Sequence, residues 1–198
     1  MTGRGRPRKF DRQQALERAM QVFWAKGYEG AQLAELTGAM GINPPSFYAA
    51  FGSKQAIFHE AVELYLGTAG AKAMLALEET ADTRAAVEAM LRASAAVALA
   101  APGSGGCLLI IGLINGQPDS EPSRAYLRDL RRMTLARVHA RLERGVSEGD
   151  LPAATDTAAL ASFYASVMQG LSLQARDGAS AGELDAIVTA AMRAFDGA

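Results

Sequence analysis

Few side chains of this 198-residue chain could take part in bond-making chemistry, and those few are widely separated. The sequence has one cysteine, Cys107, and two histidines, His59 and His139. A single cysteine excludes an internal disulfide and a multi-cysteine zinc site, and two distant histidines offer little to a metal ion. The glycine-rich stretch "GSGGC" lacks the Lys-Ser/Thr pair of a phosphate-binding loop. We therefore expect no catalytic residues, no metal and no cofactor, and we do not expect an enzyme.

Cationic side chains, in contrast, are concentrated at the N-terminus. Residues 1–60 carry eight Lys/Arg against five Asp/Glu, whereas the rest of the chain carries twelve against sixteen. Glycine and proline disfavour regular structure in residues 1–9, which we predict to be a flexible basic arm. The order R-G-R-P resembles an AT-hook core and suits a narrow A·T minor groove, although a solvated tail is the alternative. The basic residues of the wider stretch "MTGRGRPRKFDR", residues 1–12, are Arg4, Arg6, Arg8, Lys9 and Arg12.

The stretch "NPPSFYAAFGSK", residues 43–54, predicts a short helix with sharp boundaries. Asn43 is a good N-cap, Pro44 fits the first helical position, and Gly52 can end the helix before Ser53 caps the next one. At 100° per residue, Phe47 and Phe51 share an inward face.

The opposite face of this helix carries Pro45 and Ala49, flanked by Ser46 and Tyr48. Small outward side chains let a helix enter the DNA major groove, and Lys54 at the start of the next helix could meet a phosphate. The pattern indicates a helix-turn-helix; the alternative is an ordinary packed core.

Helical periodicity extends over nearly the whole chain. Helices are expected from Asp11 to Gly27, over Leu33–Met40, over 43–51 and from Ser53 to about residue 75. Further helices are expected over 83–101, 105–115, 122–148, 156–176 and 181–195. The predicted fold is all-α with about nine helices.

The stretch "ALERAMQVFWAKGYEGAQLAELTGAMGINPPSFYAAFGSKQAIFHEAV" resembles the DNA-binding domain of the TetR/AcrR family of bacterial regulators. The resemblance implies a helix-turn-helix domain at 10–52, after the arm at 1–9, and a larger helical effector-binding and dimerisation domain at 53–198. It also implies a homodimer formed by the last two helices, which would bind a palindromic double-stranded DNA operator. Where this family usually has Thr or Ser, the chain has Ala31 and Gln32. Family positions are matched by Gly27, Ala34, Gly41, Tyr48, Phe51 and Lys54.

These arguments give two sets of candidate site residues. DNA contacts are expected from Arg4, Arg6, Arg8, Gln32, Asn43, Pro45, Ser46, Tyr48, Ala49 and Lys54. A largely apolar pocket for a small-molecule effector is expected among Met90, Cys107, Asn115, Met133, Phe163, Tyr164 and Met168. The arginine-rich helix 122–148 is expected to present a solvated face.

The expected function is that of a cytoplasmic transcriptional repressor that a small molecule releases from its operator. Two alternatives stay open: a regulator that senses electrophiles or oxidants through Cys107, and an architectural DNA-binding protein. A third function class is an enzyme that binds a small molecule, but the sequence offers no catalytic residues for it. No apolar run approaches the roughly 20 residues that would span a membrane, so no membrane partner is expected.

Overall fold

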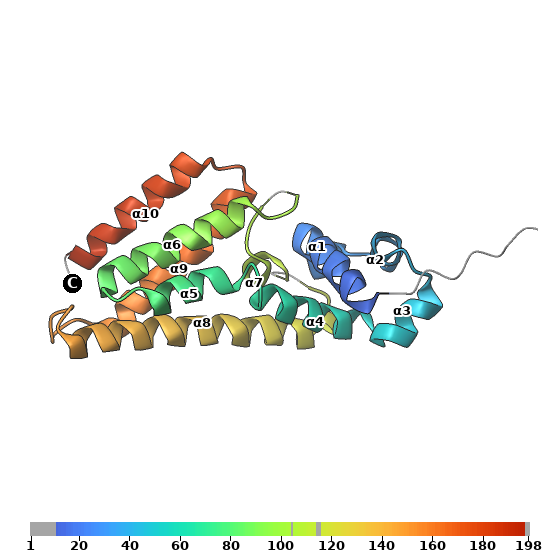
Figure 1. The fold of residues 1–198 in the computed structure, drawn as a ribbon, viewed down its shortest axis with the longest axis horizontal. Coiled ribbons are helices and arrows are strands. Elements are labelled where there is room, and N and C mark those ends of the chain that lie inside the picture. Colours follow the sequence, from blue (N-terminus) through green and yellow to red (C-terminus); the bar gives the residue numbers. More distant parts are fainter. Residues whose placement is uncertain (1–10, 104, 114–115, 197–198) are drawn as a thin grey trace, which may run out of the picture.

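The computed structural model describes residues 11–103, 105–113 and 116–196. These residues form ten α-helices and one 3-10 turn and include no strand, which confirms the predicted all-α fold (Figure 1). A cluster of three helices forms one end of the elongated molecule and the remaining helices form the body. The cluster consists of α1 (Arg12–Gly30), α2 (Leu33–Met40) and α3 (Pro44–Phe51), and α4 (Lys54–Leu66) joins it to the body.

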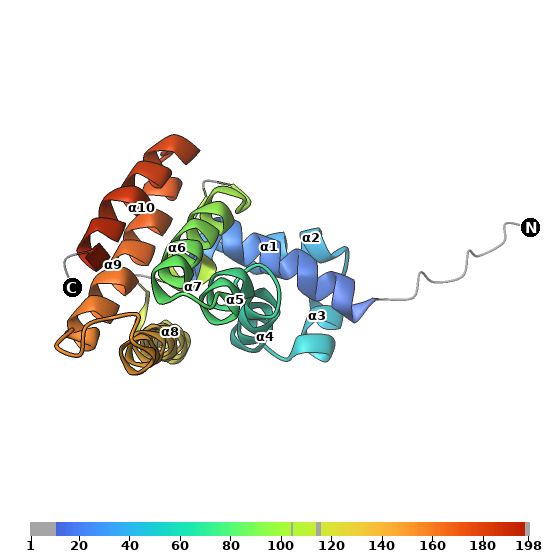
Figure 2. The same ribbon diagram turned by 60° about the vertical axis from the view of Figure 1, so that its left-hand side comes forward.

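The body is built around a long helix, α8 (Glu121–Glu148), which runs along one side of the molecule (Figure 1). At the edge away from the three-helix cluster, α9 (Thr157–Arg176) and α10 (Ala181–Asp196) lie side by side (Figure 2). Between these elements lie α5 (Ala71–Glu79), α6 (Thr83–Leu99) and the single turn α7 (Leu108–Ile111). The 3-10 turn η1 (Pro118–Ser120) directly precedes α8.

Local capping sets the ends of the first four helices. The Asn43 side chain accepts the Ser46 N–H at 2.9 Å, and the Ser53 hydroxyl accepts the Ala56 N–H at 3.0 Å. Each bond satisfies a backbone donor that the first helical turn leaves without a partner. Between α2 and α3, Gly41 has φ 70°, a left-handed conformation that any side chain would strain. The short α3 therefore begins after the Asn43 cap and ends at Gly52, which has φ 75°, as the sequence predicted.

Two helices differ from their predicted lengths. The helix expected from Ser53 to about residue 75 ends at Leu66, and α5 begins at Ala71. A side chain at Gly70 would meet the ring of Tyr65 at 2.5 Å, so the break makes room for that buried ring. The helix expected over 105–115 is confined to the single turn of α7, because Gly105 and Gly106 have φ values of 89° and 97° that no regular helix contains.

Two apolar clusters hold the molecule together. The first contains α1–α4 and is completed by Val97 of α6, Leu108 of α7 and Leu127 of α8. The second lies within the body, among α5, α6, α8, α9 and α10. The three-helix end of the molecule is therefore packed onto the body through shared side chains. No helix of the described residues is long and apolar enough to cross a membrane.

Candidate DNA-binding interface and effector cavity

The outer face of α3 is exposed and carries small side chains. Phe47 and Phe51 are buried against the neighbouring helices, as the periodicity predicted. Pro45, Ser46 and Ala49 are exposed on the outside, and Tyr48 is 52% exposed beside them. The structure therefore brings these four predicted DNA-contacting residues together on one accessible surface, where a major groove could approach the helix.

The two amides predicted near this surface have structural partners. Asn43 accepts the Ser46 N–H as the N-cap of α3. Gln32 immediately precedes α2, where its side-chain amide donates to the Glu29 carbonyl at 3.2 Å. Its backbone N–H donates to the Glu35 carboxylate at 3.3 Å, in the manner of a capping box. Gln32 remains exposed, so its amide lies at the surface beside the end of α1.

Lys54, the first residue of α4, is held above an aromatic ring. Its ammonium lies 4.5 Å from the centre of the Tyr28 ring, an arrangement in which the ring face attracts the cation. Partial burial lowers the pKa of Lys54, and the charge of Glu29 opposes that shift. Lys54 was predicted as a phosphate contact, but its neighbour Tyr28 was not predicted because the two residues are distant in the chain.

Arg12 fixes the start of α1 against α3 and α4. Its guanidinium lies 4.6 Å from the centre of the Phe51 ring and donates to the Glu60 carboxylate at 2.8 Å and to the Ala50 carbonyl at 3.3 Å. The hydrogen bond to Glu60 raises the pKa of Arg12. This arginine of the basic N-terminal stretch therefore orients helices instead of reaching out to a ligand. Arg4, Arg6 and Arg8 lie outside the described residues.

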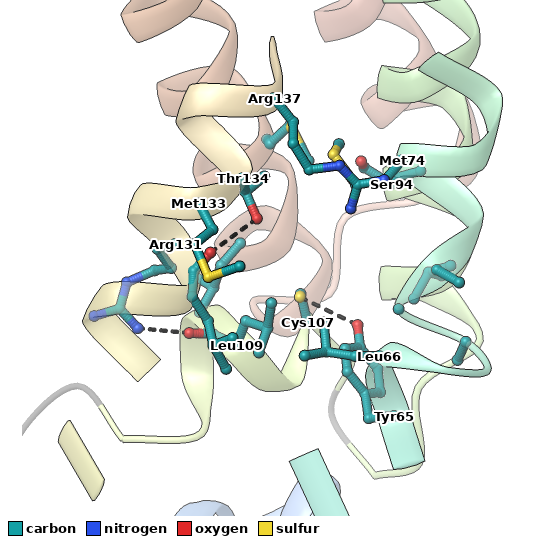
Figure 3. Close-up of a pocket in the computed structure, with 18 of the residues that line it drawn as sticks. Tyr65, Leu66, Met74, Ser94, Cys107, Leu109, Arg131, Met133, Thr134 and Arg137 are labelled. Carbon is teal, nitrogen blue, oxygen red and sulfur yellow. Dashed lines mark hydrogen bonds between the residues drawn. The ribbon is translucent and has the colours of Figure 1, made fainter. Parts of the chain in front are cut away.

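A cavity of about 340 Å³ lies in the body, beside the end of α4. Its walls come from α4, α5, α6, α7, α8 and α9, and they include Met168. The wall residues labelled in Figure 3 include Tyr65, Met74, Cys107, Leu109 and Met133. Most of this lining is apolar, and three of the wall residues are methionines, whose flexible thioethers adapt to ligands of different shape. The described lining includes no acidic residue, and its two charged members are Arg131 and Arg137.

Both arginines of the lining have partners. Arg137 extends from α8 across the cavity toward Met74 and Ser94 in Figure 3 and donates through Nε to the Glu78 carboxylate at 2.9 Å. Arg131 donates to the Leu109 carbonyl at 2.6 Å. The cavity is therefore an apolar space with cationic groups at its border.

The predicted pocket residues divide into two groups. Cys107, Met133 and Met168 line the cavity. Met90 and Tyr164 do not, because their side chains are fully buried in the second apolar cluster. Phe163 lies 40% exposed on the outer side of α9, and Asn115 falls outside the described residues. Helical periodicity identifies the inward face of a helix but not which neighbours that face meets, and this explains the misplaced residues.

Cys107 lies where the cavity meets the end of α4. The Tyr65 hydroxyl donates to its Sγ at 3.1 Å, and its own N–H donates to the Ser172 hydroxyl at 2.7 Å. Burial raises the pKa of the thiol, and the hydrogen bond from Tyr65 opposes that shift. The α7 turn that follows is only four residues long. A helix this short can do little to stabilise a thiolate at its N-terminus, and desolvation has the larger effect on the pKa of the thiol.

The outer face of α9 and α10 is rich in small exposed residues. Ser162, Ser166 and Gly170 lie along α9, together with Phe163 and the 48%-exposed Leu173. Ala186 and Ala190 are exposed on α10. Such a surface lets another pair of helices approach closely.

Two family profiles together account for most of the chain. The profile of bacterial regulatory proteins of the tetR family matches residues 15–61, and a tetracyclin repressor-like C-terminal domain matches residues 68–192. The chain belongs to the TetR family. Members of this family are transcriptional regulators, so the expectation that the chain is a DNA-binding regulator and not an enzyme is confirmed.

Several TetR-family relatives match over nearly the full length. The transcriptional repressor ComR of Escherichia coli K12 is 33% identical over 192 residues, covering 96% of this chain and 91% of the relative. The repressor BdcR of the same organism is 31% identical, with 95% and 89% covered. A cysteine mutant of the TetR-family regulator CifR, solved with 26-bp double-strand operator DNA, is 45% identical. That structure has a TM-score of 0.91 and covers 96% of this chain and 100% of its own.

One letter pattern typical of hydrolases escaped the sequence analysis. Residues 145–149 read G-V-S-E-G, which matches the G-x-S-x-G pattern of a nucleophile elbow. That motif requires a sharp turn from a strand to a helix, whereas Ser147 lies in the last turn of α8 and donates to the Arg144 carbonyl at 2.7 Å. In this chain the pattern instead marks the end of α8, where Gly149 is the left-handed C-cap.

Proposed function

We propose that this chain is a repressor that binds a palindromic operator as a homodimer and leaves it when a small molecule occupies the cavity. The observation that carries this proposal is the course of α4. The helix begins with Lys54 beside the exposed face of α3 and ends with Tyr65 and Leu66 in the cavity wall. A ligand that moves the end of α4 would therefore also move its beginning. The relatives ComR and BdcR are named as repressors, which supports repression, and not activation, by this chain.

The proposed DNA contacts combine base edges and phosphates. Pro45, Ser46 and Ala49 would meet base edges in the major groove, while Tyr48 and Lys54 would contact phosphates. Gln32, between the end of α1 and the start of α2, would offer a side-chain amide near these contacts. The arm with Arg4, Arg6 and Arg8 would enter the adjacent minor groove. The complex of the CifR mutant with operator DNA, at 45% identity, supports binding of double-stranded operator DNA by this chain.

The exposed face of α9 and α10 is the proposed dimer interface. A two-fold dimer fits a palindromic operator, because each protomer then reads one half-site. Close approach of small residues such as Gly170 would allow four helices, two from each protomer, to pack together. A regulator of this kind works in the cytoplasm, where the operator is.

Selection of genomic DNA fragments by the purified protein tests the proposal. Enrichment of one palindromic sequence is expected, and the genes beside it would point to the effector. The selected operator should bind with a log–log salt slope of about −5 to −9, since phosphate contacts from two protomers release counterions. Removal of residues 1–9 should make that slope shallower. Enrichment of A·T-rich DNA without a defined sequence would instead support an architectural protein.

Control by electrophiles through Cys107 is a second candidate function. The observation that favours it is the position of Cys107 in the wall of the cavity, beside the hydroxyl of Tyr65. An electrophile that entered the cavity would meet this sulfur. Desolvation raises the pKa of the half-buried thiol, which argues for slow reaction. Release of operator DNA by an electrophile such as N-ethylmaleimide from the native protein, but not from Cys107→Ser, would support this function. Equal release from both proteins would exclude it.

A further inference from the structure

Residues 105–113, here called the cavity-wall segment, lie between the cavity and α1. Cys107, Leu109 and Ile110 of this segment line the cavity. Leu108 and Leu113 are buried in the apolar cluster that contains α1 and α4. The segment therefore has one side toward the proposed effector and the other toward the DNA-binding helices.

Two short hydrogen bonds join the cavity-wall segment to α1. The indole N–H of Trp24 donates to the Gly106 carbonyl at 2.7 Å in a buried position, and the backbone N–H of Tyr28 donates to the Gly112 carbonyl at 2.7 Å. Buried bonds of this kind are costly to break without a replacement partner. A displacement of the segment must therefore either carry α1 with it or leave buried polar groups unsatisfied.

The second bond exists because α1 is kinked at Gly27. This residue has φ 71° and ψ 175°, far from helical values, so the ladder of helical hydrogen bonds is interrupted there. The N–H of Tyr28 turns instead to the Gly112 carbonyl. A Cβ at residue 27 would lie 3.0 Å from that carbonyl oxygen, so glycine also permits the close approach of the two backbones.

The cavity-wall segment is bonded to the body as well. The Gly106 N–H donates to the Ala98 carbonyl of α6 at 2.9 Å, and the Cys107 N–H donates to the Ser172 hydroxyl of α9 at 2.7 Å. Packed elements held from both sides tend to change between discrete arrangements and do not deform continuously. Occupancy of the cavity would therefore act on the bonds to α1 and on the bonds to the body together.

From α1, aromatic contacts lead to the DNA-binding surface. The ring of Tyr28 carries the Lys54 ammonium at 4.5 Å and meets the ring of Phe58 edge-on at 4.9 Å. The ring of Trp24 meets the ring of Tyr65 edge-on at 4.9 Å, and Tyr65 bonds to Cys107 in the cavity. Trp24 and Tyr28 of α1 thus both touch α4, the helix that starts at the proposed phosphate contact.

We propose that the cavity-wall segment transmits occupancy of the cavity to the DNA-binding helices through Trp24 and Tyr28. This inference rests on the proposed effector role of the cavity. Trp24 and Tyr28 are positioning residues: Trp24 holds α1 on the Gly106 carbonyl, and Tyr28 holds Lys54 in place. An occupant that pushes the segment outward weakens both bonds and releases α1 and Lys54 from their DNA-binding positions.

Trp24 is the only tryptophan of the chain, so its fluorescence tests the first step. Benzyl methanethiosulfonate can place an artificial occupant on Cys107, the only cysteine. The thiolate attacks the sulfenyl sulfur, a mixed disulfide forms and methanesulfinate leaves. We expect the Trp24 emission to change when mass spectrometry shows one adduct, and to return after reduction with dithiothreitol. Cys107→Ser should show no change. Ala165→Phe, which places a ring in the same cavity without chemistry, should reproduce the altered emission.

Affinity for the selected operator tests the second step. The adduct is expected to weaken operator binding of the native protein by about 5–150-fold, the usual range of allosteric coupling. Trp24→Phe keeps an aromatic ring but lacks the donor to Gly106, so the adduct should weaken its binding far less. Equal weakening in both proteins, or weakening without any change in Trp24 emission, would overturn the role of Trp24 and leave effector control in place. If neither the adduct nor Ala165→Phe alters operator affinity, cavity control and its transmission both fail.

Discussion

The guanidinium of Arg141, on α8, donates to the hydroxyl of Thr83, the first residue of α6, and so links these two helices. Arg141 also donates to the Ala81 carbonyl at 2.6 Å and to the Thr80 carbonyl at 3.3 Å, just beyond the end of α5. The side chain is buried, with 4% of its surface exposed. The expectation of a solvated arginine face on α8 is therefore wrong at Arg141, which satisfies the backbone carbonyls between α5 and α6.

Replacement of Arg141 by Met should destabilise the fold. The variant keeps the apolar stem but leaves buried carbonyl groups without a donor, a loss of about 3 kcal/mol in the free energy of unfolding. Urea denaturation monitored by circular dichroism measures this quantity. Arg132→Met is the control, since Arg132 is exposed on the same helix and should change the free energy by less than about 0.5 kcal/mol. Similar effects of the two variants would contradict the structural role of Arg141.

Asp150 should make stability dependent on pH in the acidic range. The hydroxyl and the N–H of Thr83 donate to its carboxylate at 2.7 and 3.0 Å, and these bonds hold the pKa of Asp150 below its ordinary value. A lowered folded-state pKa contributes stability above the unfolded value of about 4, and that contribution is lost as the pH falls through the folded value. Unfolding free energies measured from pH 6 to pH 3 should therefore fall more steeply for the native protein than for Asp150→Asn. Parallel curves would remove this role of Asp150.

Gly170→Arg should separate the proposed dimer without unfolding the protomer. A Cβ at this position of α9 meets no atom within 4 Å, so the protomer has room for a side chain. In a close-packed four-helix interface the same arginine would clash and bury a charge. Analytical ultracentrifugation should show monomers of native helicity that bind the operator weakly. Ala140→Arg, on the exposed face of α8, should remain dimeric. A dimer that persists in Gly170→Arg would place the interface elsewhere.

Thymine methyl groups should contribute to operator recognition. The outer face of α3 offers Pro45, Ser46 and Ala49, and it has no Arg, Lys, Asn or Gln that could make a bidentate bond to a purine. Apolar contact with thymine is what Pro45 and Ala49 can provide. Replacement of a contacted thymine by uracil removes one methyl group and should cost about 1 kcal/mol in binding free energy. Full tolerance of uracil, together with an indispensable guanine at the centre of each half-site, would refute this mode of reading.

Features with a local cause could be predicted from the sequence. Asn43 and Ser53 set the starts of α3 and α4 by accepting N–H bonds from residues three positions away, and Pro44 fits the first helical position of α3. The spacing of Phe47 and Phe51 among small residues gives α3 its two faces. Such signals need no knowledge of the rest of the fold. The domain layout of the remaining helices was predicted from the family resemblance.

Features that depend on distant partners were not predictable in this way. α1 is kinked at Gly27, where the Tyr28 N–H donates to the Gly112 carbonyl just after α7, and no residue nearby in sequence announces that contact. Arg141 is buried because the end of α5 lies beside it. Met90 and Tyr164 point inward as periodicity requires, but into a packed cluster and not into the cavity. In each case the decisive neighbour comes from another helix.

The apolar cluster that α1–α4 share with Val97, Leu108 and Leu127 has a consequence for exchanging parts between regulators. A chimera joined at residue 52 would cut through one core and combine halves whose side chains had not been fitted to each other. Complementary pairs such as the α1 kink and the Gly112 carbonyl would be separated as well. Pro45, Ser46 and Ala49 lie outside that core. New operator specificity is therefore more readily obtained by substituting these three residues than by transplanting the helices that carry them.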